Sequence, residues 1–160
     1  EIKNQSTYWL IFELIWRDYF KYISLKHGNN IFKIGGILNK NYDWSNNKKI
    51  IQNWINGETK DDFVNANMIE LKRTGWMSNR GRQNVASYFA KELTLDWRIG
   101  AAYFESMLLD YDVHSNYGNW MYVSGVGNDP RDRKFNTQLQ AERYDPAHLF
   151  RNRWLQQTLF

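Results

Sequence analysis

The chain has 160 residues, of which 42% are hydrophobic and 24% are charged, with a formal net charge of +4 and no cysteine. This composition favours one soluble globular domain with a sizeable hydrophobic core. It excludes a disulfide framework, a thiolate zinc site and a cysteine nucleophile, and it suits a reducing compartment. The small basic excess permits a polyanionic partner without requiring one.

Helical periodicity runs through the first half of the chain. Residues 6–25 predict a helix that is apolar almost all round, so we expect it to be buried between neighbours. Residues 28–47 form a Gly-, Asn- and Lys-rich connection with little pattern. A short helix over residues 48–55 follows, and a further helix is capped by Asp61 and ends at Gly75.

The second half of the chain continues the helical pattern. One helix starts at Asn79, and another is capped by Asp96. After Asp112 we expect a Gly- and Asn-rich loop or a short helix, then an irregular tail with weak helices near residues 138–142 and 149–154. Because neither strand alternation nor an internal repeat is present, the predicted fold class is all-α, with a single helical domain over all 160 residues.

Membrane and metal binding are both disfavoured. No segment is long and apolar enough to span a bilayer, and the first residues lack the basic and apolar regions of a signal peptide. His27, His114 and His148 lie far apart, without the spacing of metal ligands. We therefore expect an intracellular, soluble protein without a metal site, whose histidines have ordinary hydrogen-bond partners.

Three groups of polar residues interrupt the apolar background. In the first helix Glu13, Trp16, Arg17 and Phe20 share one face through their spacing. A surface pair of Glu13 and Arg17 would contribute only about 0.3–0.5 kcal/mol. A helix that is apolar on nearly all sides should instead bury the pair, and a buried arginine needs an anion or a full set of hydrogen bonds.

The second group is the sequence Asn79-Arg80-Gly81-Arg82-Gln83, at the predicted start of a helix. Arginine presents a planar fork of donors that suits carboxylate or phosphate, and a helix N-terminus adds free backbone N–H groups. The group could therefore clamp an anion, although a capped helix with solvated arginines is the more ordinary interpretation.

The third group is Asp110, Asp112 and Asn116, which we place at the end of one helix and in the loop after it. Carboxylates at a helix C-terminus are disfavoured by the helix dipole, so both aspartates need a cation or a hydrogen-bond donor. Arg82 and Arg17 are the candidate partners.

Long stretches of the chain resemble one known family. These stretches are FELIWRDYF, WINGETK, VNANMIELKRTGWMSNRGRQNVASYF, DWRIGAAYFESMLLDYDVHSNYGNWMYVSGVGNDPR and FNTQLQAERYDP. They are similar to the FAD-binding domain of the photolyase/cryptochrome family, in its DASH cryptochrome branch, over nearly the whole chain. The resemblance implies an all-helical domain that holds a U-shaped FAD, in which blue light drives an electron from reduced flavin into a cyclobutane pyrimidine dimer.

The resemblance also implies cofactor-binding roles. The residues concerned are Arg17, Asn79, Arg82, Asp110, Asp112 and Asn116. Arg17 matches an arginine beside the FAD phosphates, and Arg82 matches one that pairs with the acid at Asp110 near the flavin edge. Asp112 matches a residue hydrogen-bonded to the isoalloxazine ring, and Asn116 matches the residue that faces its reactive nitrogen.

A second set of positions matches residues that face the lesion or the DNA backbone. These positions are Glu13, Trp16, Asn79, Arg80, Gln83, Tyr122 and Gln140. Arg80 would hold a DNA phosphate while Arg82 organises the flavin, so the resemblance favours the anion clamp. Glu13 and Asn116 are the side chains that it associates with the chemistry itself.

Aromatic residues make up 17% of the chain, with eight tryptophans, which exceeds what packing a domain of this size requires. Trp44, Trp97 and Trp120 match the three tryptophans that pass electrons from the surface to the flavin. In most helical domains Trp97 and Trp120 would be core rings and Trp44 a surface anchor, and only their joint alignment favours electron transfer. We interpret Trp76 as a packing residue.

Details of the match indicate the branch and the extent of the chain. Gln83 and Tyr122 follow the DASH pattern, whereas (6-4) photolyases carry a histidine pair where Ser78 and Asn79 stand. The N-terminal α/β antenna domain and an upstream phosphate loop have no counterpart here. We therefore expect a fragment that in isolation holds FAD poorly, and a folate-type antenna pigment would belong to the missing domain.

Two functions remain open from the sequence. The first is a light-driven lyase of the deoxyribodipyrimidine photo-lyase type, acting as a monomer on dimers in damaged, preferentially single-stranded DNA. The second is a blue-light photoreceptor or a nucleic-acid-binding regulator without repair activity. The cytoplasm is the default location, with an organelle or the nucleus left open.

Overall fold

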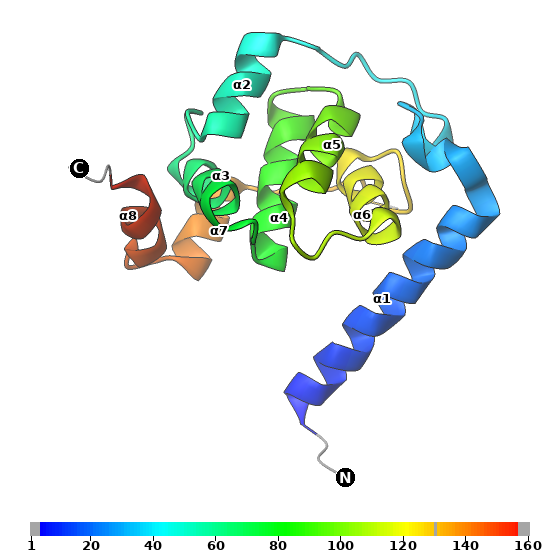
Figure 1. Ribbon diagram of the computed structural model, residues 1–160, viewed down its shortest axis with the longest axis horizontal. Helices are drawn as coiled ribbons and strands as arrows, with labels where there is room; N and C mark the ends of the chain where they lie inside the picture. Colours follow the sequence, from blue (N-terminus) through cyan, green and yellow to red (C-terminus); the bar gives the residue numbers. More distant parts are fainter. Residues whose placement is uncertain (1–3, 130, 157–160) are drawn as a thin grey trace.

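A computed structural model of the chain describes residues 4–129 and 131–156, which are almost entirely helical (Figure 1). The elements are α1 (Gln5–His27), η1 (Gly28–Phe32), η2 (Gly36–Leu38), α2 (Lys48–Asn56), α3 (Asp62–Thr74), α4 (Asn79–Ser87), η3 (Tyr88–Glu92), α5 (Trp97–Met107), α6 (Val113–Ser124), α7 (Thr137–Tyr144) and α8 (Leu149–Leu155). In these residues strand pairing is limited to an isolated parallel bridge between Ser45 and Leu95. The predicted all-α fold class is confirmed.

Local signals in the sequence set several helix ends. The Asp61 carboxylate accepts the N–H of Val64 at 2.9 Å, and Asp96 accepts the N–H of Arg98 at 3.1 Å, so both act as the expected N-caps. Gly75 ends α3 with a φ of 69°, a left-handed conformation that glycine adopts without strain.

The core is built from α2, α3, α4, η3, α5 and α6 and lies around the centre of Figure 1. Four aromatic rings form its middle. The Trp54 ring lies 4.5 Å from that of Phe89, and the Trp120 ring lies 5.2 Å from that of Phe104 and 5.8 Å from that of Phe89 between centroids. Trp120 therefore belongs both to this core and, as described below, to the wall of a pocket.

The prediction that α1 is buried is wrong. Leu10 is 63% exposed and Ile15 is 60% exposed, while Phe20 and Ser24 are the buried residues of the helix. Figure 1 shows the N-terminal part of α1 (blue) projecting away from the other helices. An apolar helix is buried only where a partner covers it, and among the described residues α6 and η1 are its main partners.

Two other segments are more ordered than their composition suggests. The connection over residues 28–47 contains two 3₁₀-helices, and the segment after Asp112, where we expected a loop or a short helix, is the three-turn helix α6. The glycine content of α6 serves packing, because a Cβ at Gly118 would lie 2.3 Å from the Phe20 ring. That glycine lets α1 and α6 approach closely.

Two smaller expectations also need correction. Trp76 is 51% exposed, so it is not a packing residue of the described core. The buried Nδ1 of His114 has no hydrogen-bond partner among the described residues, although we expected satisfied histidines. The helix that starts at Asn79 continues from Tyr88 as a π-helical turn, η3. None of the described helices combines the length and the hydropathy that crossing a membrane requires.

Candidate functional site

Two adjoining pockets lie between α4 and α6 and contain most of the predicted site residues. The first is lined by Asn79, Arg82, Gln83, Ala86, Phe104, Leu108, Asp110, Tyr111, Asp112, Ser115, Asn116, Asn119, Trp120 and Val123. The second is lined by Trp9, Phe12, Glu13, Trp16, Arg17, Phe20, Asn79, Arg80, Gln83, Ser115, Asn119, Tyr122, Val123, Arg133 and Phe135. Asn79 and Gln83 from α4 face both pockets, so the two spaces share a wall.

Arg82 and Asp110 form the polar edge of the first pocket. The Arg82 guanidinium donates to both carboxylate oxygens of Asp110 at 2.9 Å, and its Nε donates to the Met77 carbonyl at 2.9 Å. Both Asp110 oxygens accept from the same Arg82 nitrogen, Nη2, and the Asp110 side chain is 57% exposed. An ion pair this exposed adds little to the free energy of unfolding, so its main effect is to orient the guanidinium. Arg82 is therefore the partner of Asp110 anticipated from the sequence.

Asp112 does not end a helix, as we predicted, but begins one. Its carboxylate caps α6 by accepting the N–H of Ser115 at 2.8 Å. Burial acts to raise the pKa of Asp112, but the hydrogen bonds from Ser115 and the neighbouring His114 together hold that pKa below its ordinary value. The carboxylate therefore stays ionised at the mouth of the pocket, where its favourable position at a helix N-terminus also stabilises it.

Asn116 lies inside α6, one turn after Asp112, and is 8% exposed. Its amide nitrogen donates to the Ala101 carbonyl of α5 at 3.0 Å. This bond fixes the orientation of the side chain, because the amide nitrogen must face α5. The carboxamide therefore has a defined direction in the wall of the first pocket.

An apolar wall faces these polar groups across the first pocket. Phe104, Leu108 and Trp120 contribute to it, and Trp120 Nε1 is buried with no hydrogen-bond partner in the described residues. One flat aromatic side and one edge of convergent hydrogen-bonding groups suit a planar heterocycle with a polar rim. The residues present therefore fit part of a flavin.

The basic residues that line the second pocket are Arg17, Arg80 and Arg133, from α1, α4 and the segment after α6. The Arg80 guanidinium donates to the Gln83 carboxamide at 2.9 Å and lies 5.1 Å from the centre of the Tyr144 ring. Arg80 is thus held in place while its charge still faces the pocket.

Gln140, which we also expected near the DNA, lies on α7 one helical turn before Tyr144 and does not line the pocket. Its buried Oε1 has no hydrogen-bond partner in residues 4–129 and 131–156.

The α1 side of the second pocket differs from what we expected. Glu13 and Arg17 are exposed rather than buried, and Arg17 pairs with its neighbour Asp18 at 3.3 Å instead of with Glu13 or the aspartates after α5. Both side chains nevertheless line the pocket together with Trp16. The Trp16 ring packs edge-on against the Tyr122 ring, with centroids 5.9 Å apart.

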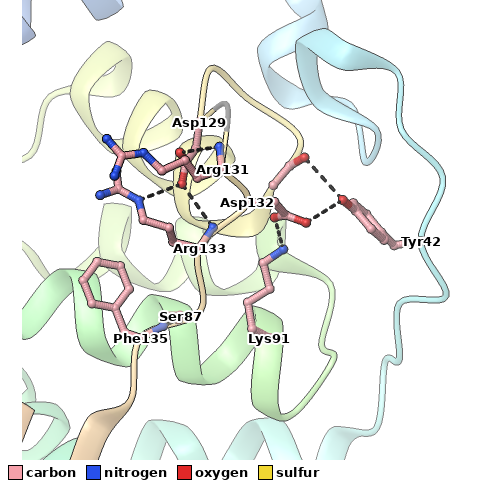
Figure 2. Close-up of polar contacts among 9 residues, drawn as sticks. Tyr42, Ser87, Lys91, Asp129, Arg131, Asp132, Arg133 and Phe135 are labelled. Carbon is pink, nitrogen blue, oxygen red and sulfur yellow. Dashed lines mark hydrogen bonds and ion pairs between the residues drawn. The ribbon is translucent and has the colours of Figure 1, made fainter. Parts of the chain in front are cut away.

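Arg133 is a pocket residue that sequence reasoning missed. Its guanidinium donates to the Tyr122 hydroxyl and lies 5.8 Å from the centre of that ring. Figure 2 shows Arg133 held by the buried Asp129, whose carboxylate accepts the Arg133 Nε at 3.3 Å. Burial acts to raise the pKa of Asp129, but hydrogen bonds from Arg131 and Arg133 lower it overall. A charge-rich sequence in an irregular segment gave no local signal for this placement.

The structure places Trp120 on α6, Trp97 on α5 and Trp44 beside the Ser45–Leu95 bridge. Trp120 lines the first pocket and packs on Gly100, where a Cβ would lie 2.2 Å from the indole. Trp97 lies one turn earlier on α5, is fully buried and donates from its indole N–H to the Ile34 carbonyl at 2.9 Å. Trp44 is half-buried and directly precedes the Ser45–Leu95 bridge. Trp120 thus lies in the pocket wall, Trp97 in the core and Trp44 in a half-buried position, and an electron path through the three stays a prediction.

Comparisons with known proteins agree with this geometry. Residues 9–158 match the model of the FAD binding domain of DNA photolyase. The chain is 56% identical to a Cryptochrome DASH of Natronomonas pharaonis, over 96% of this chain and 32% of that protein. It is 52% identical to a chloroplastic/mitochondrial Cryptochrome DASH of Arabidopsis thaliana, over 98% of this chain and 28% of that protein.

Solved structures give the same result. The crystal structure of a Synechocystis cryptochrome superposes with a TM-score of 0.94 at 52% identity, over 97% of this chain and 32% of that chain. A class III photolyase from Agrobacterium tumefaciens superposes with a TM-score of 0.88 at 31% identity, over 97% of this chain and 33% of that chain. The chain thus spans about a third of the length of the relatives that it matches. It belongs to the photolyase/cryptochrome family, as part of the FAD-binding domain, with relatives of 51–56% identity named as DASH cryptochromes.

Proposed function

We propose that the chain is the C-terminal part of the FAD-binding domain of a longer flavoprotein that repairs cyclobutane pyrimidine dimers, preferentially in single-stranded DNA, under blue light. The observation that carries this proposal is the wall that the two pockets share, which is formed by Asn79, Gln83, Ser115, Asn119 and Val123. A flavin in the first pocket and a pyrimidine dimer flipped into the second would lie against the same side chains. Such proximity is what a short-range electron transfer requires.

Bound FAD would supply the light-driven one-electron chemistry, and the protein's part is to orient it. Asp112 and the Arg82–Asp110 pair would hold the polar rim of the flavin, and Asn116 would face it from α6. Trp120, Phe104 and Leu108 would exclude water from the ring. Arg17 is exposed on α1 and open to a phosphate, which supports its role beside the dinucleotide's phosphates.

Lesion binding is proposed for the residues around the second pocket. Trp16 and Tyr122 offer aromatic faces and edges on which a flipped-out dimer can pack, and the Arg133–Asp129 pair keeps Tyr122 in position. Glu13 can hydrogen-bond the dimer from the α1 side. Arg80 would contact a DNA phosphate at the rim, where its charge adds affinity without reading sequence.

The tryptophan path is proposed as the electron supply for the cofactor. Trp120 touches the first pocket, Trp97 is buried and Trp44 reaches the half-buried side of the domain, so electrons would enter at Trp44. None of the three tryptophans lines the second pocket, although Trp120 lies on α6, which contributes residues to both pockets. Electron supply and lesion binding can therefore be separated by mutation.

A blue-light receptor without repair activity is the alternative, and it is supported by the names of the relatives from Natronomonas pharaonis and Arabidopsis thaliana, both of which are called cryptochromes. The two functions differ in their effect on DNA. The test is to reduce the flavin of the full-length protein chemically and to illuminate it with a single-stranded oligonucleotide that carries one dimer. We expect the dimer to be split in blue light and retained in the dark. If the flavin is fully reduced and absorbs the light but the dimer remains intact after illumination, the receptor function is favoured.

A further inference from the structure

Gln83 of α4 and Asn119 of α6 lie in the wall that the two pockets share, on helices that pack against each other (Figure 1). Each side chain ends in a carboxamide, whose oxygen only accepts hydrogen bonds and whose nitrogen only donates them. The direction of a carboxamide is therefore fixed once the chemistry of one of its partners is known.

The Gln83 carboxamide is oriented by Arg80. The Arg80 guanidinium lies 2.9 Å from Gln83 Oε1, and a guanidinium has no acceptor. The oxygen of Gln83 must therefore face Arg80, which leaves the amide nitrogen, with two N–H donors, for a ligand in the pockets. Gln83 is half-buried, so this donor has little freedom to turn.

The Asn119 carboxamide is oriented in the opposite sense. Its nitrogen lies 2.9 Å from the backbone carbonyl oxygen of Ser115, which can only accept a hydrogen bond. The nitrogen must therefore face Ser115, and the exposed side chain offers its oxygen to the pockets. The shared wall thus carries one oriented donor and one oriented acceptor.

A donor beside an acceptor is the complement of a cyclic imide. In thymine and uracil the ring N3–H donates and the adjacent C4 carbonyl accepts, and a cyclobutane dimer, which forms at C5 and C6, leaves this edge unchanged. In cytosine the pattern is reversed, because N3 accepts and the C4 amino group donates. A wall that fits an imide therefore meets cytosine with donor against donor and acceptor against acceptor, which leaves desolvated groups unpaired.

We propose that Gln83 and Asn119 are specificity-determining residues that bind the imide edge of a thymine or uracil within the dimer and select against cytosine. The inference rests on the proposed function, since it takes the dimer to occupy the second pocket. Gln83 Nε2 donates to the C4 carbonyl, and Asn119 Oδ1 accepts from N3–H. A dimer has a second base edge, and Glu13 lines the same pocket from α1.

A flavin also carries an imide, at the polar end of its ring system. In the first pocket, however, Asp112 supplies an acceptor and Arg82 a donor, and neither of these residues lines the second pocket. The flavin imide therefore has candidate partners of its own, whereas Gln83 and Asn119 are open to the second pocket as well. This difference assigns the two carboxamides to the dimer, and FAD affinity tests the assignment.

The experiment measures binding in the dark, so that no dimer is split. The full-length, FAD-loaded protein is titrated by fluorescence anisotropy with three single-stranded oligonucleotides. One carries a thymine–thymine dimer, one carries a cytosine–cytosine dimer that is prepared cold and used before it deaminates, and one is undamaged. We expect the wild type to bind the thymine dimer more tightly than the cytosine dimer. Asn119→Ala removes the acceptor and should weaken binding of the thymine dimer about 3- to 10-fold, as expected for one neutral hydrogen bond, with little change for the cytosine dimer.

Two further variants complete the test. Gln83→Glu keeps the shape of the side chain and an oxygen for Arg80 but replaces the amide donor with an acceptor, so the preference should shift towards cytosine. The added negative charge weakens binding of all three oligonucleotides and cancels in the ratio of the two dimer affinities. Asn152→Ala removes an exposed asparagine of α8 outside both pockets, so it should leave this ratio unchanged. The FAD affinity of each apoprotein is measured in parallel.

The ratio of the two dimer affinities decides the inference. Equal affinity of the wild type for both dimers, or a ratio that survives Asn119→Ala and Gln83→Glu, overturns imide recognition alone. A fall in FAD affinity with an unchanged ratio assigns the carboxamides to the flavin and also overturns it. A full-length protein that neither prefers the thymine dimer to the undamaged strand nor splits it in blue light contradicts the proposed function itself.

Discussion

Asp112 performs two tasks that mutation can separate. Its carboxylate caps α6 through the Ser115 N–H at 2.8 Å, and it also lines the first pocket, where we propose that it binds the flavin rim. Asp112→Ala removes both. We expect a loss of about 1 kcal/mol in unfolding free energy from the cap. We also expect a loss of about 1.5–3 kcal/mol in flavin binding, which is about 10- to 150-fold in affinity.

Two further variants isolate the flavin contribution. Asp112→Asn keeps an oxygen for the Ser115 N–H but presents an amide donor where the carboxylate presented an acceptor, so it should retain stability and still lose flavin. Asn47 caps α2 by accepting the N–H groups of Lys49 and Ile50, outside both pockets. Asn47→Ala should therefore lower stability by a similar amount and leave flavin binding unchanged.

The assay is FAD titration of the full-length apoprotein by fluorescence, beside denaturant unfolding of the same variants. Flavin affinity should fall in both Asp112 variants and remain at the wild-type level in Asn47→Ala. Wild-type FAD affinity in Asp112→Asn would show that the carboxylate only caps α6. An equal loss of FAD in Asn47→Ala would show that the effect follows stability and not contact.

Three other predictions concern electron supply, DNA affinity and acid stability. Trp120→Phe should abolish photoreduction of oxidised flavin while chemically reduced protein still splits dimers; equal photoreduction rates in mutant and wild type would remove Trp120 from the path. Arg80→Ala should weaken binding to damaged and undamaged DNA alike and lower the salt-dependence slope by about one unit, measured by fluorescence anisotropy at several salt concentrations; a loss confined to damaged DNA would contradict a phosphate contact. Burial acts to raise the pKa of Asp145, but the hydrogen bond from Arg151 at 2.9 Å and the neighbouring backbone N–H groups hold that pKa below its ordinary value of 3.8. The ionised carboxylate therefore stabilises the fold above pH 3.8, and this stabilisation is lost as the pH falls through the lower pKa of the folded state. Asp145→Asn should lower unfolding free energy at pH 7 and flatten its acid decline, and an unchanged pH profile would refute the linkage.

Local chemistry explains why much of the fold was predictable. The caps at Asp61 and Asp96 and the stop at Gly75 act within a few residues of their own positions, so sequence alone reveals them. Gly118 shows where prediction from local sequence fails. A glycine at this position indicates a loop, and its role in the helix is clear only once the Phe20 ring that packs against it is known. The exposure of α1 was equally unpredictable, since burial depends on what covers a helix and not on its own pattern.

The candidate site divides in the same way. The need of Asp110 for a cation followed from the expected helix dipole, and Arg82, 28 residues away, meets it. Asp112 was misplaced because its neighbours were interpreted as a loop, although it is an ordinary N-cap. Arg133 was missed because its position depends on a tertiary bond to Tyr122 from an irregular segment.

Dimer splitting per absorbed photon, normalised to bound FAD, tests most directly whether the second pocket holds the lesion beside the flavin. The variant is Glu13→Ala in the full-length protein, and the control is Glu142→Ala, which removes an exposed carboxylate outside both pockets. We predict that Glu13→Ala lowers the normalised yield more than it lowers DNA affinity, and that Glu142→Ala changes neither. An unchanged normalised yield in Glu13→Ala would contradict a lesion-binding role for this pocket.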